Sequence, residues 1–201
     1  MNEFKFLSEL YEDIYCWLAS NTPGEYVTKQ YFKNIDKKVW SKIANKFKEL
    51  EAKKFLSDAE KEFLDCKYVG KAYRIISYYR RRKGHVYLIN YYQSCSKSLN
   101  GIENVKLHGN VILIELFSSD KSYSIDLFKV LEFMIKNKLI IYKDEFDINH
   151  RNVLNLEKYY NEEEVLVIIS KENIKDISIH DFKNDEFRKL EKNKWFRNNM
   201  W

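Results

Sequence analysis

The sequence predicts an α+β protein in which a helical part, residues 1–69, precedes a mixed, strand-rich part, residues 70–201. The apolar residues predict this division, because they follow helical spacing before Gly70 and form short runs rich in Tyr, Ile and Val after it. Hydrophobic residues make up 45% of the chain, which is enough to build a core. Only 5 Gly and 1 Pro occur among 201 residues, so collagen-like, mucin-like and linker proteins are excluded.

Three helices are expected in the first part. The first carries one apolar face and ends before Pro23-Gly24, and the second covers residues 38–55. A short third helix is expected to start at Ser57, because Ser57 and Glu60 have the spacing of a capping box. The apolar faces of the first two helices are formed by Phe4, Leu7, Leu10, Tyr11, Ile14, Tyr15, Leu18, Val39, Trp40, Ile43, Phe47 and Leu50.

The second part is expected to consist mainly of strands. The run over residues 110–117 is nearly continuous in apolar residues and predicts a buried strand. Residues 127–135 return to helical spacing. Further short strand-like runs cover residues 72–79, 85–92, 139–142, 165–169 and 174–179.

Composition also limits the compartment and the ligands. No apolar run approaches the roughly 18 residues of a membrane span, and the N-terminus lacks the features of a signal peptide. The three cysteines form no close pair and the histidines show no ligand spacing, so we expect reduced thiols, no metal site and a cytoplasmic location. There is no Gly-rich phosphate loop. These residues are Cys16, Cys66, Cys95, His85, His108, His150 and His180.

The net charge of +5 is modest, with 35 Lys and Arg against 30 Asp and Glu. The densest basic run, residues 80–83, is typical of a solvated hairpin loop between two strands. Such a charge permits binding to phosphate-bearing ligands or acidic proteins, whereas nucleic-acid binding is possible but not indicated.

Three polar segments stand in a fixed order on the expected strands. The first contains Arg74, the second contains Ser94-Cys95-Ser96 after two tyrosines, and the third runs from the acids of residues 162–164 into a buried strand. In this order they resemble the arginine, Ser-Thr-Ser and Glu-x-Glu motifs of toxin-like mono-ADP-ribosyltransferases. The resemblance covers residues 69–181. Cys95 stands where the family usually has Thr, and Ile75 where many members have Gly.

This resemblance implies a β-sandwich catalytic domain of the ADP-ribosyltransferase type over residues 70–201, with residues 1–69 as a helical N-terminal subdomain. In size and layout the chain is most similar to small phage Alt/Mod-type enzymes. It implies transfer of ADP-ribose from NAD to a protein arginine with release of nicotinamide. The implied partner is a host protein, such as one of the transcription or translation machinery, in the cytoplasm of an infected or targeted cell.

The resemblance also assigns the cofactor-binding residues. A guanidinium fixed on a strand is a good bidentate donor for a pyrophosphate, and by motif Arg74 would hold that of NAD. Ser94 and Ser96 would support the nicotinamide ribose and orient the catalytic glutamate. Tyr91 and Tyr92 lie where the family has an aromatic residue lining the nicotinamide pocket.

Two glutamates are the expected catalytic residues. Cleavage of the bond between nicotinamide and ribose develops oxocarbenium charge, which a carboxylate near the ribose stabilises, and the motif gives this role to Glu164. Glu162 lies two residues earlier, on the same side of an extended segment. By resemblance Glu162 activates the acceptor, and a Glu at this place is associated with arginine acceptors.

Each motif also has a purely structural interpretation. Arg74 is commonly explained as an edge-strand arginine in an ion pair, the serines as a turn, and the acids as a solvated turn. A second function is therefore kept open, a non-catalytic module that binds nucleic acid or protein through residues 80–83 and the helical N-terminus. Such a module would bind nucleic acid with steep salt dependence and would not cleave NAD.

Overall fold

The computed structural model describes residues 2–19, 34–77, 92–103, 110–140, 163–181 and 186–189. These residues combine helices with an antiparallel sheet, so the α+β class is confirmed. The chain forms two compact units. The first unit contains residues 1–67 and 125–160, and the second contains residues 68–124 and 161–201. This differs from a single division near residue 70, because residues 125–160 join the first unit.

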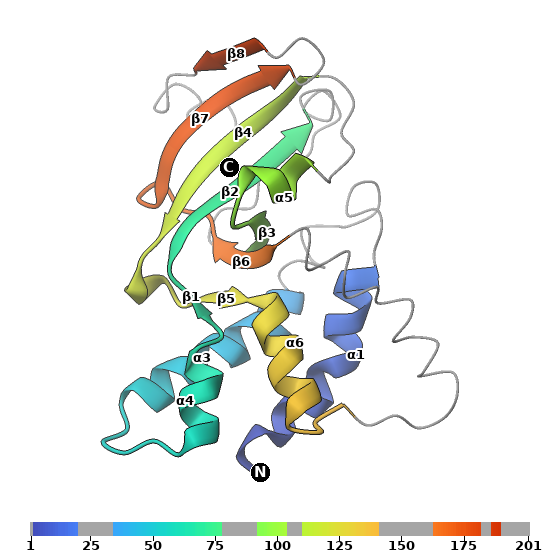
Figure 1. Ribbon diagram of the computed structural model, residues 1–201, viewed down its shortest axis with the longest axis vertical. Coiled ribbons are helices and arrows are strands. Elements are labelled where there is room, and N and C mark those ends of the chain that lie inside the picture. Colours follow the sequence, from blue (N-terminus) through green and yellow to red (C-terminus); the bar gives the residue numbers. More distant parts are fainter. Residues whose placement is uncertain are drawn as a thin grey trace. The chain divides into compact units, whose positions relative to one another are not determined.

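The first unit contains most of the described helical elements. The second expected helix is shorter than its pattern predicts, because one π-helical turn, η2, precedes α3 and the helix ends at Glu51. No helix of the described residues is both long and apolar enough to cross a membrane. The elements are η1 (Asn2–Phe4), α1 (Lys5–Ala19), η2 (Asp36–Trp40), α3 (Ser41–Glu51), α4 (Asp58–Leu64) and α6 (Leu127–Lys136) (Figure 1).

The capping box predicted ahead of α4 is confirmed. The Ser57 hydroxyl accepts a hydrogen bond from the Glu60 amide at 3.3 Å, and the Glu60 carboxylate accepts one from the Ser57 amide at 2.7 Å. Lys53 also donates to the Glu60 carboxylate. The bond from Lys53 and those from Ser57 lower the pKa of Glu60 from its usual 4.5 to about 2. The start of α4 is thus held by charge-assisted bonds as well as by its cap.

Four phenylalanines form the centre of the first unit. The ring centroid of Phe63 lies 5.0 Å from that of Phe4 and 5.1 Å from those of Phe47 and Phe133. Phe63 and Phe47 are fully buried, and Phe133 is 2% exposed. Because Phe133 belongs to α6, a helix distant in sequence completes this aromatic cluster.

The second unit is an antiparallel sheet with the order β6-β3-β2-β4-β7-β8. Strands β2, β4 and β7 run side by side and curve together (Figure 1). The short strands β1 (Lys67–Tyr68) and β5 (Ser124–Asp126) carry the chain across the boundary between the units. The strands of this sheet are β2 (Gly70–Ser77), β3 (Tyr92–Ser96), β4 (Asn110–Ser118), β6 (Glu164–Ile168), β7 (Ile174–Asp181) and β8 (Glu186–Lys189).

Strands β2, β4, β6 and β7 correspond to four of the predicted runs. Of the run predicted over residues 85–92, only Tyr92 lies within the described residues, and it begins β3. Leu139 and Ile140 of the run at 139–142 are in no strand, because the amide of Leu139 closes the end of α6 by donating to the Met134 carbonyl. Helix α5 (Leu99–Glu103) and strand β8 have no counterpart in the sequence prediction.

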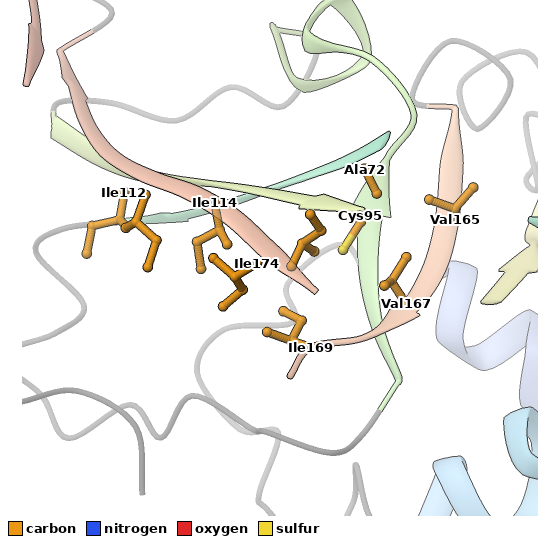
Figure 2. Close-up of a cluster of buried hydrophobic side chains, with 10 residues drawn as sticks. Ala72, Cys95, Ile112, Ile114, Val165, Val167, Ile169 and Ile174 are labelled. Atoms are coloured by element: carbon orange, nitrogen blue, oxygen red, sulfur yellow. The ribbon is translucent and has the colours of Figure 1, made fainter. Parts of the chain in front are cut away.

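One face of this sheet carries the core of the second unit. Alternate residues of the paired strands point to the same side, where they form one buried cluster (Figure 2). The cluster consists of Ala72, Cys95, Ile112, Ile114, Leu116, Val165, Val167, Ile169, Ile174 and Ile177.

Strands β2 and β3 are joined at one point in the described part of the sheet. Strand β2 pairs with β4 along its whole length, and β3 pairs with β6 along its whole length. Between β2 and β3, in contrast, the described residues form a single pair, Tyr73 with Ser96. We call this pair and its immediate neighbours the β2–β3 junction.

The aromatic cluster predicts a large loss of stability on truncation of Phe133. Phe133→Ala is expected to lower the free energy of unfolding by about 3–5 kcal/mol, because it leaves a cavity beside Phe63. Urea denaturation followed by circular dichroism measures this change. The matched control is Phe55→Ala, whose side chain is 81% exposed and whose effect should stay within about 0.5 kcal/mol. Equal effects of the two substitutions would contradict the packing described.

Candidate functional site

Glu164 and Ser96 are direct neighbours at the β2–β3 junction. They form a residue pair between the first residue of β6 and the last residue of β3. Directly opposed residues of antiparallel strands have Cβ atoms roughly 5 Å apart on one face of the sheet. Glu164 is 8% exposed and Ser96 is 6% exposed, so both polar groups are largely shielded from water. The Ser96 hydroxyl oxygen accepts from the Ser98 amide at 3.3 Å, which leaves its proton to donate.

Arg74 reaches the same strand from β2. Its guanidinium donates a hydrogen bond to the backbone carbonyl of Ser94. The side chain is half-buried, and no carboxylate among the described residues forms an ion pair with it. Glu115, on the neighbouring strand β4, is paired with Lys71 instead. The interpretation of Arg74 as an ion-paired edge arginine therefore does not fit the described structure.

The strand register distributes the expected residues over two faces. Ser94 and Ser96 share one face with Glu164, whereas Cys95 between them belongs to the buried cluster on the other face. By alternation from Tyr73, Arg74 belongs to the face of Cys95. Its bond to a strand carbonyl, however, holds the guanidinium near the plane of the sheet, between β2 and β3. The junction thus brings all three motif segments together, and only the serines and Glu164 share a face.

The pKa of the Cys95 thiol depends on burial and on two charges near the β2–β3 junction. Burial raises the pKa of the Cys95 thiol to about 12; the Arg74 charge lowers it and the Glu164 charge raises it by smaller amounts. Both charges therefore act on the same buried position. The thiol is neutral at physiological pH and is chemically inert in the folded protein.

The turn before β6 does not have the extended backbone assumed from the sequence. Glu163 has a φ of 49°, in the left-handed region, and its carbonyl accepts a hydrogen bond from the Lys97 amide at 3.1 Å. The extended segment expected from Glu162 to Glu164 is therefore interrupted at Glu163. Glu162 itself lies outside the described residues. One carboxylate oxygen of Glu163, Oε2, is buried without a hydrogen-bond partner.

Of Tyr91, Tyr92 and the basic run at 80–83, the structure describes Tyr92. Tyr92 is buried, and its hydroxyl donates to the Tyr123 carbonyl at 2.8 Å, so it acts as a structural residue of the sheet. Tyr91 and the basic run at 80–83 lie outside the described residues. Within the described ranges, no group of three His, Cys, Asp or Glu side chains is arranged to hold a metal ion.

Sequence reasoning missed one polar residue at this site, Gln93. It is 5% exposed, and its side-chain nitrogen Nε2 has no hydrogen-bond partner. Counting alternate residues back from Cys95 would have placed Gln93 on the buried face of β3. The signal in the sequence was a polar amide two residues before Cys95, at a position that strand alternation places on the same face.

Comparison with known proteins returned no match. The chain matches no protein-family model, no curated protein and no solved structure. The function is therefore argued from the residues of the β2–β3 junction.

The burial of Cys95 predicts a slow reaction with alkylating reagents. At pH 8 a thiol with a pKa near 12 is protonated, so its thiolate fraction is on the order of 1,000-fold below that of an ordinary cysteine. Iodoacetamide should label the Cys95 peptide slowly in the folded protein and rapidly in guanidinium chloride. Peptide mass spectrometry measures both rates, and similar rates would show that Cys95 is exposed.

Proposed function

We propose that this protein is a mono-ADP-ribosyltransferase that transfers ADP-ribose from NAD to a protein acceptor, with arginine as the favoured residue. The observation that carries the proposal is the direct pairing of buried Glu164 with Ser96 on strand β3, whose Ser94 carbonyl accepts a hydrogen bond from Arg74. These residues come from three motifs that are far apart in the sequence, in the order of the family they resemble. They lie on three neighbouring strands, β2, β3 and β6.

Glu164 supports cleavage of NAD by its charge. The bond between the nicotinamide nitrogen and the ribose C1′ breaks with its electron pair leaving on nicotinamide, and positive charge develops on the ribose. A carboxylate that is mostly withdrawn from water interacts more strongly with this charge than a solvated one does. Ser96, next to Glu164, supplies a hydroxyl that can orient the carboxylate or the ribose.

Transfer then requires an activated acceptor. A guanidinium nitrogen of the acceptor arginine forms the new bond to C1′ and gives up a proton, and Glu162 is assigned to receive this proton. Arg74 would hold the NAD pyrophosphate, since a guanidinium without a carboxylate partner among the described residues is suited to an anion. The proposed reaction uses NAD as a co-substrate and no metal ion.

The finer assignments follow from this function. The strand-rich part would be a β-sandwich of the ADP-ribosyltransferase type, with Ser94 and Tyr91 near the nicotinamide ribose and ring. The acceptor would be a host protein, for example of the transcription or translation machinery, in the cytoplasm of an infected or targeted cell. The alternative of a non-catalytic binding module depends mainly on residues 80–83, which lie outside the described structure.

Loss of the Glu164 charge is expected to remove activity. With labelled NAD and a bacterial lysate, Glu164→Gln should lower label transfer and nicotinamide release by about 100- to 1,000-fold. The matched control is Glu132→Gln, which neutralises an exposed glutamate of α6 and should leave both rates unchanged. Thermal melting of both variants checks that they fold. Absence of transfer in the wild type, or equal activity of Glu164→Gln, would contradict the enzyme and favour the binding module.

Glu162→Gln should separate the two steps of the reaction. Transfer to an arginine-containing acceptor is expected to fall at least tenfold more than hydrolysis of NAD to ADP-ribose and nicotinamide, because only transfer requires activation of the acceptor. Chromatography of the two products from one reaction measures this ratio. Equal losses would remove the acceptor-activating role from Glu162.

A further inference from the structure

Gln93 has an unsatisfied donor in a place where water does not reach it freely. The side chain is 5% exposed, and the buried Nε2 atom has no hydrogen-bond partner. A buried amide hydrogen without an acceptor is costly, and native proteins rarely retain one without a reason. Gln93 stands opposite Val167, which belongs to the buried cluster, so its side chain lies on the cluster face of β3.

Arg74 is a second donor at the same strand. Among the described residues, its guanidinium donates one hydrogen bond, to the carbonyl of Ser94, the residue that follows Gln93. The guanidinium has five N–H groups, so most of its donor capacity is left unused among the described residues. It is half-buried, which makes an uncompensated positive charge more expensive than at the surface.

The two donors belong to the same side of the junction. Gln93 and Cys95 alternate onto one face of β3, and the Arg74 charge acts on the Cys95 thiol from β2. That thiol is neutral, so it does not compensate the guanidinium. Among the described residues, no carboxylate forms an ion pair with Arg74 and no acceptor bonds to Gln93 Nε2, so both donors can take a further, anionic acceptor.

We infer that Gln93 and Arg74 together form an anion site that binds a phosphate group, with Gln93 Nε2 and the Arg74 guanidinium as donors. A phosphate offers several oxygens in different directions, so it can accept from a planar guanidinium and from a separate amide at once. A pyrophosphate or the phosphates of a dinucleotide have the same chemistry.

The inference partly rests on the proposed function. If the protein binds NAD, Gln93 becomes a second residue for its pyrophosphate, one that the motif resemblance does not assign. The anion site itself depends only on Arg74 and Gln93, so it can be tested with inorganic pyrophosphate alone.

The chain is well suited to a direct test, because it has two glutamines, Gln30 and Gln93. Selective ¹⁵N labelling of glutamine side chains gives one pair of NH₂ signals for each glutamine in an NMR spectrum, and Gln93→Glu removes one pair and so assigns both. Titration with pyrophosphate should shift the Gln93 signal while the Gln30 signal stays in place. Saturation binding without a shift of the Gln93 signal, or no binding up to about 10 mM, would overturn the inference.

Two substitutions test the role of each donor. Gln93→Met should raise the Kd for pyrophosphate about ten- to hundredfold, with an unchanged or higher melting temperature, because it removes an unsatisfied buried amide. A purely structural Gln93 predicts the reverse, a lower melting temperature and the same Kd. Gln93→Glu replaces the amide donor with a carboxylate on the face to which Arg74 belongs, and should abolish pyrophosphate binding even if Gln93→Met fails to fold.

Arg74→Gln should weaken pyrophosphate binding at least as strongly. Its matched control is Lys171→Gln, which removes one exposed positive charge from the turn after β6. Equal effects of the two variants would show a nonspecific charge effect and overturn the site.

Parallel assays with NAD separate the two proposals. Pyrophosphate binding through Gln93 without any transfer of ADP-ribose leaves the anion site standing and removes the proposed function. ADP-ribose transfer with a Gln93 signal that does not move, and with an unchanged KM for NAD in Gln93→Met, removes the anion site alone.

Discussion

The candidate chemistry of this protein depends on the pairing of Tyr73 with Ser96, which is the one pair between β2 and β3 in the described part of the chain. Strand β3 is fixed to β6 along its whole length, so this pair sets where Ser96 and Glu164 lie relative to β2. Arg74 adds a hydrogen bond from its side chain on β2 to the Ser94 carbonyl of β3. A shift of one residue in this register would turn the polar side chains of β3 to the opposite face.

Alternation along β3 separates its side chains into a polar face and a face that carries the apolar cluster. Ser94 and Ser96 lie with Glu164 on one face, whereas Gln93 and Cys95 lie on the face of the apolar cluster. The guanidinium of Arg74 lies between β2 and β3 and contacts the strand through its backbone. The charges of Arg74 and Glu164 both act on the buried Cys95 thiol, whose pKa is raised mainly by burial.

Much of the secondary structure follows from local sequence, and the site geometry does not. Continuous apolar runs were enough to predict β4 and β6, and the Ser57–Glu60 spacing predicted the start of α4. The membership of α6 in the first unit was not predictable, because an amphipathic helix shows that it packs but not against which partner. Glu163 adopts a left-handed φ without being Gly or Asn, so no residue type signals the break before Glu164. The β2–β3 pairing depends on contacts distant in sequence, which no local pattern encodes.

The discontinuous first unit has a consequence for how the protein is made. A ribosome releases Phe4, Phe47 and Phe63 early, but Phe133 follows Phe63 only after roughly 70 further residues. At bacterial and eukaryotic elongation rates this takes about 4 to 14 seconds. For that time the aromatic centre of the nascent chain lacks its last member, while the strands that separate the two segments are being synthesised. Until α6 emerges, the nascent chain therefore exposes an incomplete apolar cluster of helices, the kind of surface that chaperones bind.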